Sequence, residues 1–126
     1  KYPRFLKLLM LFYIKYCDAY NNASMGTNLN CGASFLSPPY LPHGLNGIIV
    51  HYDAKIGKKC TILHQVTIAG KHGKAPIIGD NVVIGAGAKI LGGVRVGNNV
   101  IIGANTVVTK DVPDNKIVVG ASMRIL

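Results

Sequence analysis

An all-β fold, a three-sided coil of short parallel strands, is predicted by a six-residue repeat in residues 77–108. Branched apolar residues occupy positions 78, 84, 90, 96, 102 and 108, which we call guide positions, and Gly directly follows four of these six. A strand repeats its inward face every two residues and a helix every ~3.6, so a period of six fits strands and not a helix. Three periods would complete one turn of a triangular β-helix, whose turns stack to bury a shared core.

The same register extends toward the N-terminus. Further guide residues stand at Leu29, Phe35, Leu41, Val50, Ile56, Ile62 and Ile68. The fourth residue after most guide positions is small or apolar, as Ala54, Cys60 and Val66 illustrate. Both sets are expected to point inward, in about four coils spaced ~4.8 Å apart. The coils are expected to begin near Leu29, Val50, Ile68 and Ile90.

Two breaks interrupt the register. The distance along the chain is nine residues from Leu41 to Val50 and ten from Ile68 to Ile78, in place of six. Insertions in a solenoid become surface loops, often on the binding face, so KHGK (71–74) is expected to bulge out. KDVPDN (110–115) predicts a turn that ends the repeat.

Residues 1–28 are expected to form a helical segment, and residues 29–126 the β-helix domain. The stretch FLKLLMLFYIKYC (5–17) is interrupted by two lysines and is too short for the ~20 residues of a membrane span. Its residues Leu6, Leu9, Met10, Tyr13 and Tyr16 share one helical face, expected to pack on the body of the protein. A basic helix lying on a membrane is the alternative. The first residue is not Met, so a fragment or a processed form is expected.

The charge balance points to an anionic partner or to a solvated basic surface. The chain has 126 residues, with 14 Lys and Arg against 5 Asp and Glu, a net charge of +9. Signatures of nucleic-acid binding are absent from the sequence, which argues against that class of partner. The three cysteines do not form a disulfide framework, which is typical of a reducing compartment such as the cytoplasm. No metal-ligand spacing is present, and no metal is expected.

Two histidines form a candidate site. His43 follows guide Leu41 by two residues, and His64 follows guide Ile62 by two residues. These guides lie at the same corner of successive coils, so the two imidazoles are expected to be neighbours. His51 directly follows a guide residue and is expected on the surface.

The sequence resembles a known family in two stretches. IGDNVVIGAGAKILGGVRVGNNVIIGANTVVTKDVP and PHGLNGIIVHYDAKIGKKCTILHQVTIAG (42–70) resemble the hexapeptide-repeat acyltransferases, in particular the serine acetyltransferase branch. The resemblance covers about residues 28–126. It implies a left-handed parallel β-helix, a homotrimer with active sites between subunits, and acetyl-CoA as co-substrate. The short stretch before the repeat is similar to that of the sugar and capsular-polysaccharide O-acetyltransferases.

The resemblance also implies roles for single residues. His43 matches the catalytic base of the family, Asn28 stands where the family has an orienting Asp, and His72 is the nearest match to a second family histidine. The expected cofactor contacts are Gly70, His72, Ala86 and Ala104 along the coils, with Lys89, Lys110 and Arg124 on the phosphates.

The implied reaction is direct transfer of an acetyl group from acetyl-CoA to a hydroxyl. An imidazole with a pKa near ~6.5 can take the hydroxyl proton as the oxygen attacks the thioester. The acceptor is a small molecule such as serine, or a glycan hydroxyl, with residues 35–44 (FLSPPYLPHG) as its expected wall. A zinc enzyme of the γ-carbonic anhydrase type and a non-catalytic scaffold are the remaining alternatives.

Overall fold

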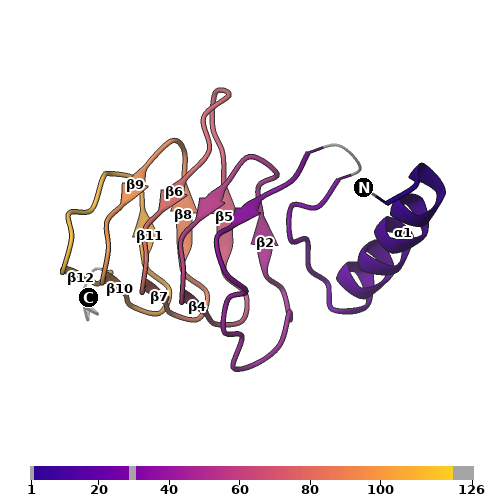
Figure 1. Ribbon diagram of the computed structural model, residues 1–126. Coiled ribbons are helices and arrows are strands. Elements are labelled where there is room, and N and C mark those ends of the chain that lie inside the picture. Colours follow the sequence, from indigo (N-terminus) through magenta and orange to yellow (C-terminus); the bar gives the residue numbers. More distant parts are fainter. Residues whose placement is uncertain (1, 29–30, 121–126) are drawn as a thin grey trace.

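The computed structural model describes residues 2–28 and 31–120. The chain begins with one helix, α1 (Arg4–Tyr20), and continues as a left-handed parallel β-helix. In Figure 1, α1 stands beside the first coil, and the coils stack away from it toward β12 at the other end of the molecule. This arrangement confirms the predicted fold class.

Three parallel sheets of four strands form the sides of the prism. The first sheet contains β1 (Ser34–Phe35), β3 (Lys55–Ile56), β6 (Ile77–Ile78) and β9 (Arg95–Val96). The second contains β4 (Thr61–Ile62), β7 (Val83–Ile84), β10 (Ile101–Ile102) and β12 (Ile117–Val118). The third contains β2 (Ile49–Val50), β5 (Thr67–Ala69), β8 (Lys89–Leu91) and β11 (Val107–Val108).

The chain visits the sheets in the order third, first, second, which creates three corners. We call the corner between the third and first sheets the loop corner; it includes residues 51–54, 70–76, 92–94 and 109–111. The turn corner joins the first sheet to the second and includes residues 57–60, 79–82 and 97–100. The histidine corner joins the second sheet to the third and includes residues 42–48, 63–66, 85–88 and 103–106.

The residues that the predicted register points inward form the core of the molecule. Every guide residue from Val50 to Val108 is at most 3% exposed. The small companions from Ala54 to Thr106 are at most 5% exposed. Phe35 and Leu41 are partly buried and pack against this core. Leu29 lies outside the described residues.

The turn corner shows why glycine follows the guide residues Ile78 and Val96. A Cβ added to Gly79 would lie 2.8 Å from the carbonyl carbon and oxygen of Gly97 in the next coil. The corner also needs left-handed backbone, which Asn adopts more readily than most residues. Asn81, Asn99 and Asn115 have φ of 55°, 55° and 58° and stack as a ladder of amide hydrogen bonds of 3.2 and 3.0 Å.

The coil does not end at residues 110–115, so that prediction was wrong. Val112 pairs in parallel with Val96 of the first sheet, and β12 then pairs with β10. The corner between Val108 and Val112 is two residues shorter than the usual period, which hides the continuation in the sequence. At the other end, Ser24 pairs with Ile49, and the stack has about five turns in place of the four predicted.

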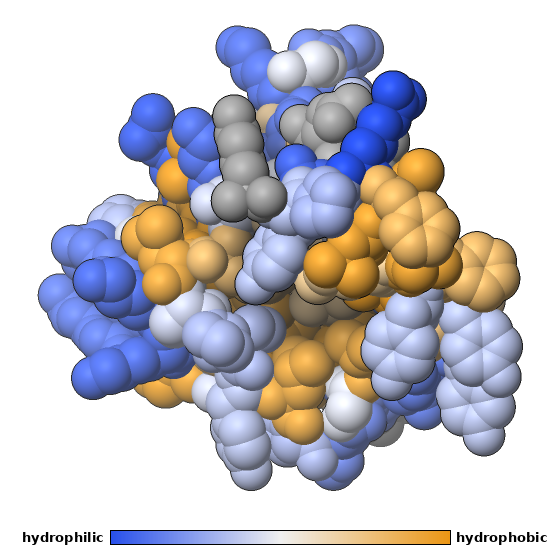
Figure 2. Space-filling view, turned by 45° about the vertical axis from the view of Figure 1, so that its right-hand side comes forward, coloured by the Kyte–Doolittle hydropathy of each residue, from blue (hydrophilic) through white to orange (hydrophobic). Residues whose placement is uncertain are grey.

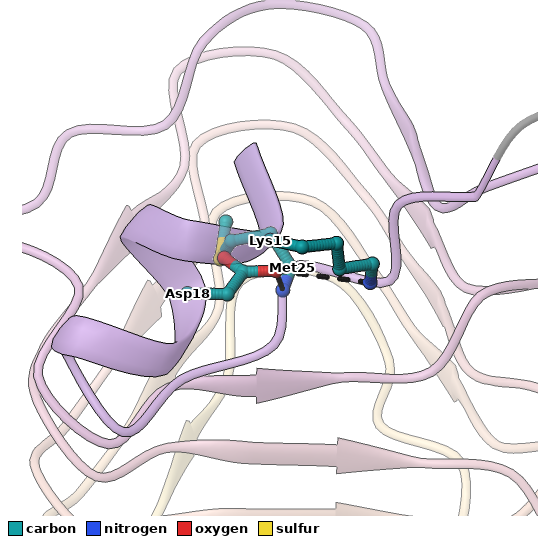
Figure 3. A network of polar contacts seen from close by, with 3 residues as sticks. All are labelled: Lys15, Asp18 and Met25. Carbon is teal, nitrogen blue, oxygen red and sulfur yellow. Dashed lines mark hydrogen bonds and ion pairs between the residues drawn. The ribbon is translucent and has the colours of Figure 1, made fainter. Parts of the chain in front are cut away.

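Polar contacts at the end of α1 fix how the helix meets the first coil. The Asp18 carboxylate is buried, accepts a 3.5 Å hydrogen bond from the Met25 amide and lies 3.9 Å from the Lys15 ammonium (Figure 3). The Gly47 amide donates to the Asn21 carbonyl at 3.0 Å. These contacts turn one side of α1 inward, the side that carries Asp18.

The predicted packing face of α1 was therefore wrong. Leu11, Ile14 and Cys17, on the Asp18 side, are half-buried. The predicted face is exposed by 37–68% at Leu6, Leu9, Met10, Tyr13 and Tyr16. Across residues 2–28 and 31–120, no helix has both the length and the apolarity to cross a membrane.

Candidate active site

His43 and His64 meet at the histidine corner. Their ring centroids are 5.0 Å apart and their planes cross at 89°, so the edge of one ring faces the other ring. The backbone explains the contact, because Tyr40 pairs in parallel with Thr61 and starts the two corners in step. The predicted proximity of the two imidazoles is confirmed.

The two rings differ in their surroundings. His43 is exposed, whereas His64 is half-buried. Within the described part of the chain, the buried His64 Nδ1 has no hydrogen-bond partner. An exposed imidazole that rests on a second ring can take a proton from an incoming hydroxyl, while the lower ring limits its rotation.

Two glycines shape the segment that carries His43. Gly44 and Gly47 have φ of 66° and 65°, a conformation that side chains disfavour. The Gly44 amide donates to Leu41 O at 3.1 Å, and the Gln65 amide of the next coil donates to Asn46 O at 2.8 Å. The three residues added between Leu41 and Val50 therefore form a tied turn that presents His43 to solvent.

Asn28, the proposed orienting residue, lines a cavity of about 220 Å³ between α1 and the first coil. Its neighbours in that cavity include Lys7, Leu11 and Ile14. The Asn28 amide donates to Cys31 O at 3.0 Å. Its role in holding His43 stays a prediction.

The predicted bulge is a tight hairpin at the loop corner, and it is visible in Figure 1 as the projection above β5 and β6. Lys71 and Lys74 exchange two backbone hydrogen bonds of 2.8 and 3.1 Å. His72 and Gly73 form the tip with φ of 51° and 73°, the left-handed pair of a two-residue hairpin turn. The insertion is thus closed by its own backbone.

Sequence reasoning missed His51, which is half-buried and lies against Gly70 at the base of this hairpin. Its ring stacks on Tyr52 with centroids 4.4 Å apart, and its Nδ1 accepts a 3.2 Å hydrogen bond from the Asp53 amide. A Cβ on Gly70 would lie 2.9 Å from His51 Nε2, so the ring occupies the space that Gly70 leaves open. Gly70 was the signal in the sequence, because a glycine in one coil leaves space for a histidine ring of the neighbouring coil.

A basic groove of about 550 Å³ runs beside the hairpin. Lys71, His72, Lys74 and Lys110 line it, with Asp111 as the acidic side chain among its lining residues. The stem of Lys74 lies over Gly93, since a Cβ there would be 2.6 Å from Lys74 Cβ. This groove can hold a polyanion such as a phosphorylated ligand.

The candidate residues are therefore divided between two corners. His43, His64, Ala86 and Ala104 lie at the histidine corner, and Lys89 follows it in β8, with its ammonium 3.2 Å from Gly87 O. Gly70, His72 and Lys110 lie at the loop corner. The third sheet separates the two groups within one chain. Arg124 lies outside the described residues. Among residues 2–28 and 31–120, no three His, Cys, Asp or Glu side chains gather as a metal group.

Known proteins share this fold and this register. Residues 75–110 match the family described as "Bacterial transferase hexapeptide (six repeats)". Residues 75–110 are therefore similar to the hexapeptide repeats of bacterial transferases. This chain is 38% identical over 105 residues to a serine acetyltransferase of Mycobacterium tuberculosis, and the match covers 80% of this chain and 45% of that relative.

Two solved structures of serine acetyltransferases are similar to this chain. The enzyme of Neisseria gonorrhoeae in complex with serine has a TM-score of 0.67 at 42% identity, over 71% of this chain and 38% of that one. The enzyme of Brucella abortus in complex with coenzyme A has a TM-score of 0.67 at 39% identity, over 75% of this chain and 39% of that one. The chain spans about half the length of the curated relatives that it matches.

Proposed function

We propose that this chain is an acetyl-CoA-dependent O-acetyltransferase of the serine acetyltransferase type. The observation that carries the proposal is the His43–His64 pair, an exposed imidazole held at a coil corner in a repeat of the transferase family. Relatives that bind serine or coenzyme A on the same fold support it.

His43 acts as the general base in this proposal. Its imidazole accepts the proton of the acceptor hydroxyl while that oxygen attacks the thioester carbonyl. The carbon–sulfur bond then breaks, and the thiolate of CoA leaves with the proton that the imidazolium returns. The products are an O-acetyl ester and free CoA, and no covalent acyl-enzyme is needed. His64 restricts the His43 ring, and Asn28 is proposed to help orient it.

A second copy of the chain is proposed to complete each site, within a homotrimer. The histidine corner and the loop corner are separated by the third sheet within one chain, so a neighbouring copy supplies the hairpin with Gly70 and His72. The outer face of the second sheet supports such packing, because Ile101 and Ile117 are apolar and 45% and 71% exposed. Exposed apolar surface of this kind is typical of subunit contacts.

Acetyl-CoA is proposed to bind between neighbouring prisms. Ala86 and Ala104 are small enough to leave room for the pantetheine arm along the histidine corner. Lys89 and Lys110 lie near enough to the surface to reach phosphates, and the basic groove beside the hairpin adds positive charge. Arg124 is proposed as a further phosphate contact on the basis of the sequence.

The acceptor is proposed to be a small hydroxyl compound, with serine as the first candidate, and segment 35–44 as its wall. A sugar hydroxyl is tested in the same assay. The three cysteines are free thiols, which supports the proposal that the protein functions in a reducing compartment such as the cytoplasm.

The test measures release of free CoA thiol from acetyl-CoA with serine and with sugar acceptors. His43→Ala is expected to lower kcat by roughly 10²–10⁴-fold, the usual contribution of a general base. Lys55→Ala, an exposed residue on the first sheet, is the matched control and keeps full activity. Full activity in His43→Ala, with circular dichroism unchanged, would remove the proposed base.

A thermal-shift measurement separates the enzyme from a scaffold. Binding of CoA to the folded state raises the melting temperature, since a ligand stabilises the state that it binds. No shift at ~1 mM CoA, together with no thiol release, would favour the scaffold.

A further inference from the structure

The outward side of α1 is a continuous apolar surface that nothing in the described chain covers. We call the residues Phe5, Leu8, Leu9, Phe12, Tyr13, Tyr16 and Tyr20 the outer face of α1; each is 47–83% exposed. Figure 2, which brings the α1 side of the molecule forward, shows orange apolar side chains beside pale aromatic rings at its right edge. Soluble chains rarely expose contiguous apolar surface of this size unless it meets a partner.

The helical period places these residues together. With ~3.6 residues per turn, the outer face forms one arc opposite the side that carries Ile14 and Asp18. No charged residue falls within that arc. Arg4 and Lys15 lie along one border of the arc, and both are exposed.

The exposed charged side chains of α1 all have the same sign. The helix has three basic residues, Arg4, Lys7 and Lys15, all exposed, and one acidic residue, Asp18. The Asp18 carboxylate is buried. It accepts a hydrogen bond from the Met25 amide and lies near the Lys15 ammonium. The exposed charges of α1 are therefore all positive, which suits an anionic partner.

We propose that the outer face of α1 lies on the surface of an anionic lipid membrane. The phenylalanines and leucines would enter the acyl boundary, and the tyrosine hydroxyls would stay at headgroup level. Arg4 and Lys15 would meet lipid phosphates, and the net charge of +9 would add a weaker long-range attraction. The helix has 17 residues, fewer than the ~20 of a membrane span, so the proposed contact is with the membrane surface.

A second copy of the chain fits this face less well. An α1–α1 contact would bring exposed bases toward each other without an exposed carboxylate on either helix. Like charges at short range are unfavourable, whereas anionic headgroups neutralise them.

The test uses flotation of the whole purified chain with vesicles. One set is phosphatidylcholine alone, and the other contains about one quarter phosphatidylglycerol, an anionic lipid. Binding is expected with the anionic set and is expected to fall in ~0.5 M NaCl, where surface charges are screened. Equal binding to both sets, or no binding to either, would overturn the proposal.

Two variants locate the contact. Phe5→Ser with Phe12→Ser removes two rings that are 71% and 75% exposed, so the fold loses little packing. The double variant is expected to bind anionic vesicles roughly a hundredfold more weakly. Val119→Ser, at a site 72% exposed at the far end of the stack, is the matched control and binds normally. Unchanged binding by the double variant would place the contact elsewhere.

Light scattering after gel filtration tests whether a second copy of the chain covers the outer face of α1. If the double variant dissociates an assembly that the original chain forms, and neither chain floats, the face belongs to a second copy and the lipid proposal fails. These readouts do not involve acetyl transfer. Vesicle binding can therefore hold while the proposed activity fails, and the reverse.

Discussion

Substitution of Gly79 by Ala tests whether tight stacking of the coils sets the stability of this protein. Gly79 lies at the turn corner, and its added Cβ would be 2.8 Å from Gly97 carbon and oxygen and 2.6 Å from Asn98 Oδ1. Real Cβ atoms essentially never approach another atom closer than 3.0 Å. The neighbours are backbone and a hydrogen-bonded amide, so they can retreat only if the two coils separate locally.

Local separation of the two coils would lower the free energy of unfolding, because it weakens two hydrogen bonds. The Gly79 amide donates to Val96 O at 2.8 Å, and the Asp80 amide donates to Asn98 Oδ1 at 2.8 Å. Overpacking costs about 1–3 kcal/mol, and weakening two hydrogen bonds adds roughly 1–2 kcal/mol. The lower entropy of the unfolded Ala chain offsets about 0.4–1 kcal/mol. We therefore expect Gly79→Ala to lower the free energy of unfolding by about 1–4.5 kcal/mol.

Gly120→Ala is the matched control, because the nearest atoms to its added Cβ are 3.8 Å away. That variant is expected to be stabilised slightly, by up to about 1 kcal/mol, through the unfolded state alone. Urea unfolding followed by circular dichroism, at one fixed protein concentration, measures both variants. Tight stacking at the turn corner is contradicted if Gly79→Ala is as stable as the original chain, or if the stability of both variants changes in the same direction.

Three further outcomes are expected. Ile62→Ala, at a fully buried guide position, is expected to cost about 2–5 kcal/mol in urea unfolding; a cost below about 1 kcal/mol would contradict the packed core. Burial raises the pKa of the Cys60 thiol above its usual 9.0, so the folded state holds that proton more tightly. The resulting stability is complete below pH 9.0 and is lost as the pH rises further, a decline that Cys60→Ala should reduce in urea unfolding curves at pH 7–10.5. Gly70→Ala is expected to displace His51 or the Lys74 backbone, because the added Cβ would lie 2.9 Å from His51 Nε2 and from Lys74 O. In the proposed enzyme this lowers kcat/KM about 10–100-fold, and overpacking costs about 1–3 kcal/mol in urea unfolding. Activity and stability at the original level would refute the tight fit at Gly70.

The core could be predicted because a closed prism leaves one side of each strand for the interior. From Val50 onward, a branched residue every sixth position can point only inward, and the structure buries all of them. The meeting of His43 with His64 followed from the same register, since positions two residues beyond guides on one corner must stack.

The errors have physical causes that a local pattern does not contain. The orientation of α1 depends on the buried Asp18 carboxylate and its contact with the Met25 amide, which outweigh the apolar pattern of the helix. The last coil was missed because its corner is shortened by two residues before Val112. His51 was assigned to the surface because the open space above Gly70 belongs to the next coil, and spacing along one coil does not show it.

From Val50 onward, both changes of repeat length fall at the loop corner: the lengthened stretch that ends at Ile78 and the shortened one that ends at Val112. The hairpin of residues 71–74 closes on its own two hydrogen bonds, so its length can change without moving the strands on either side. A change in the length of this projection would therefore leave the strands, and the paired imidazoles of the same chain, in place. The loop corner can thus vary in outline between relatives of equal coil number, while the fit between neighbouring copies decides which of those outlines are retained.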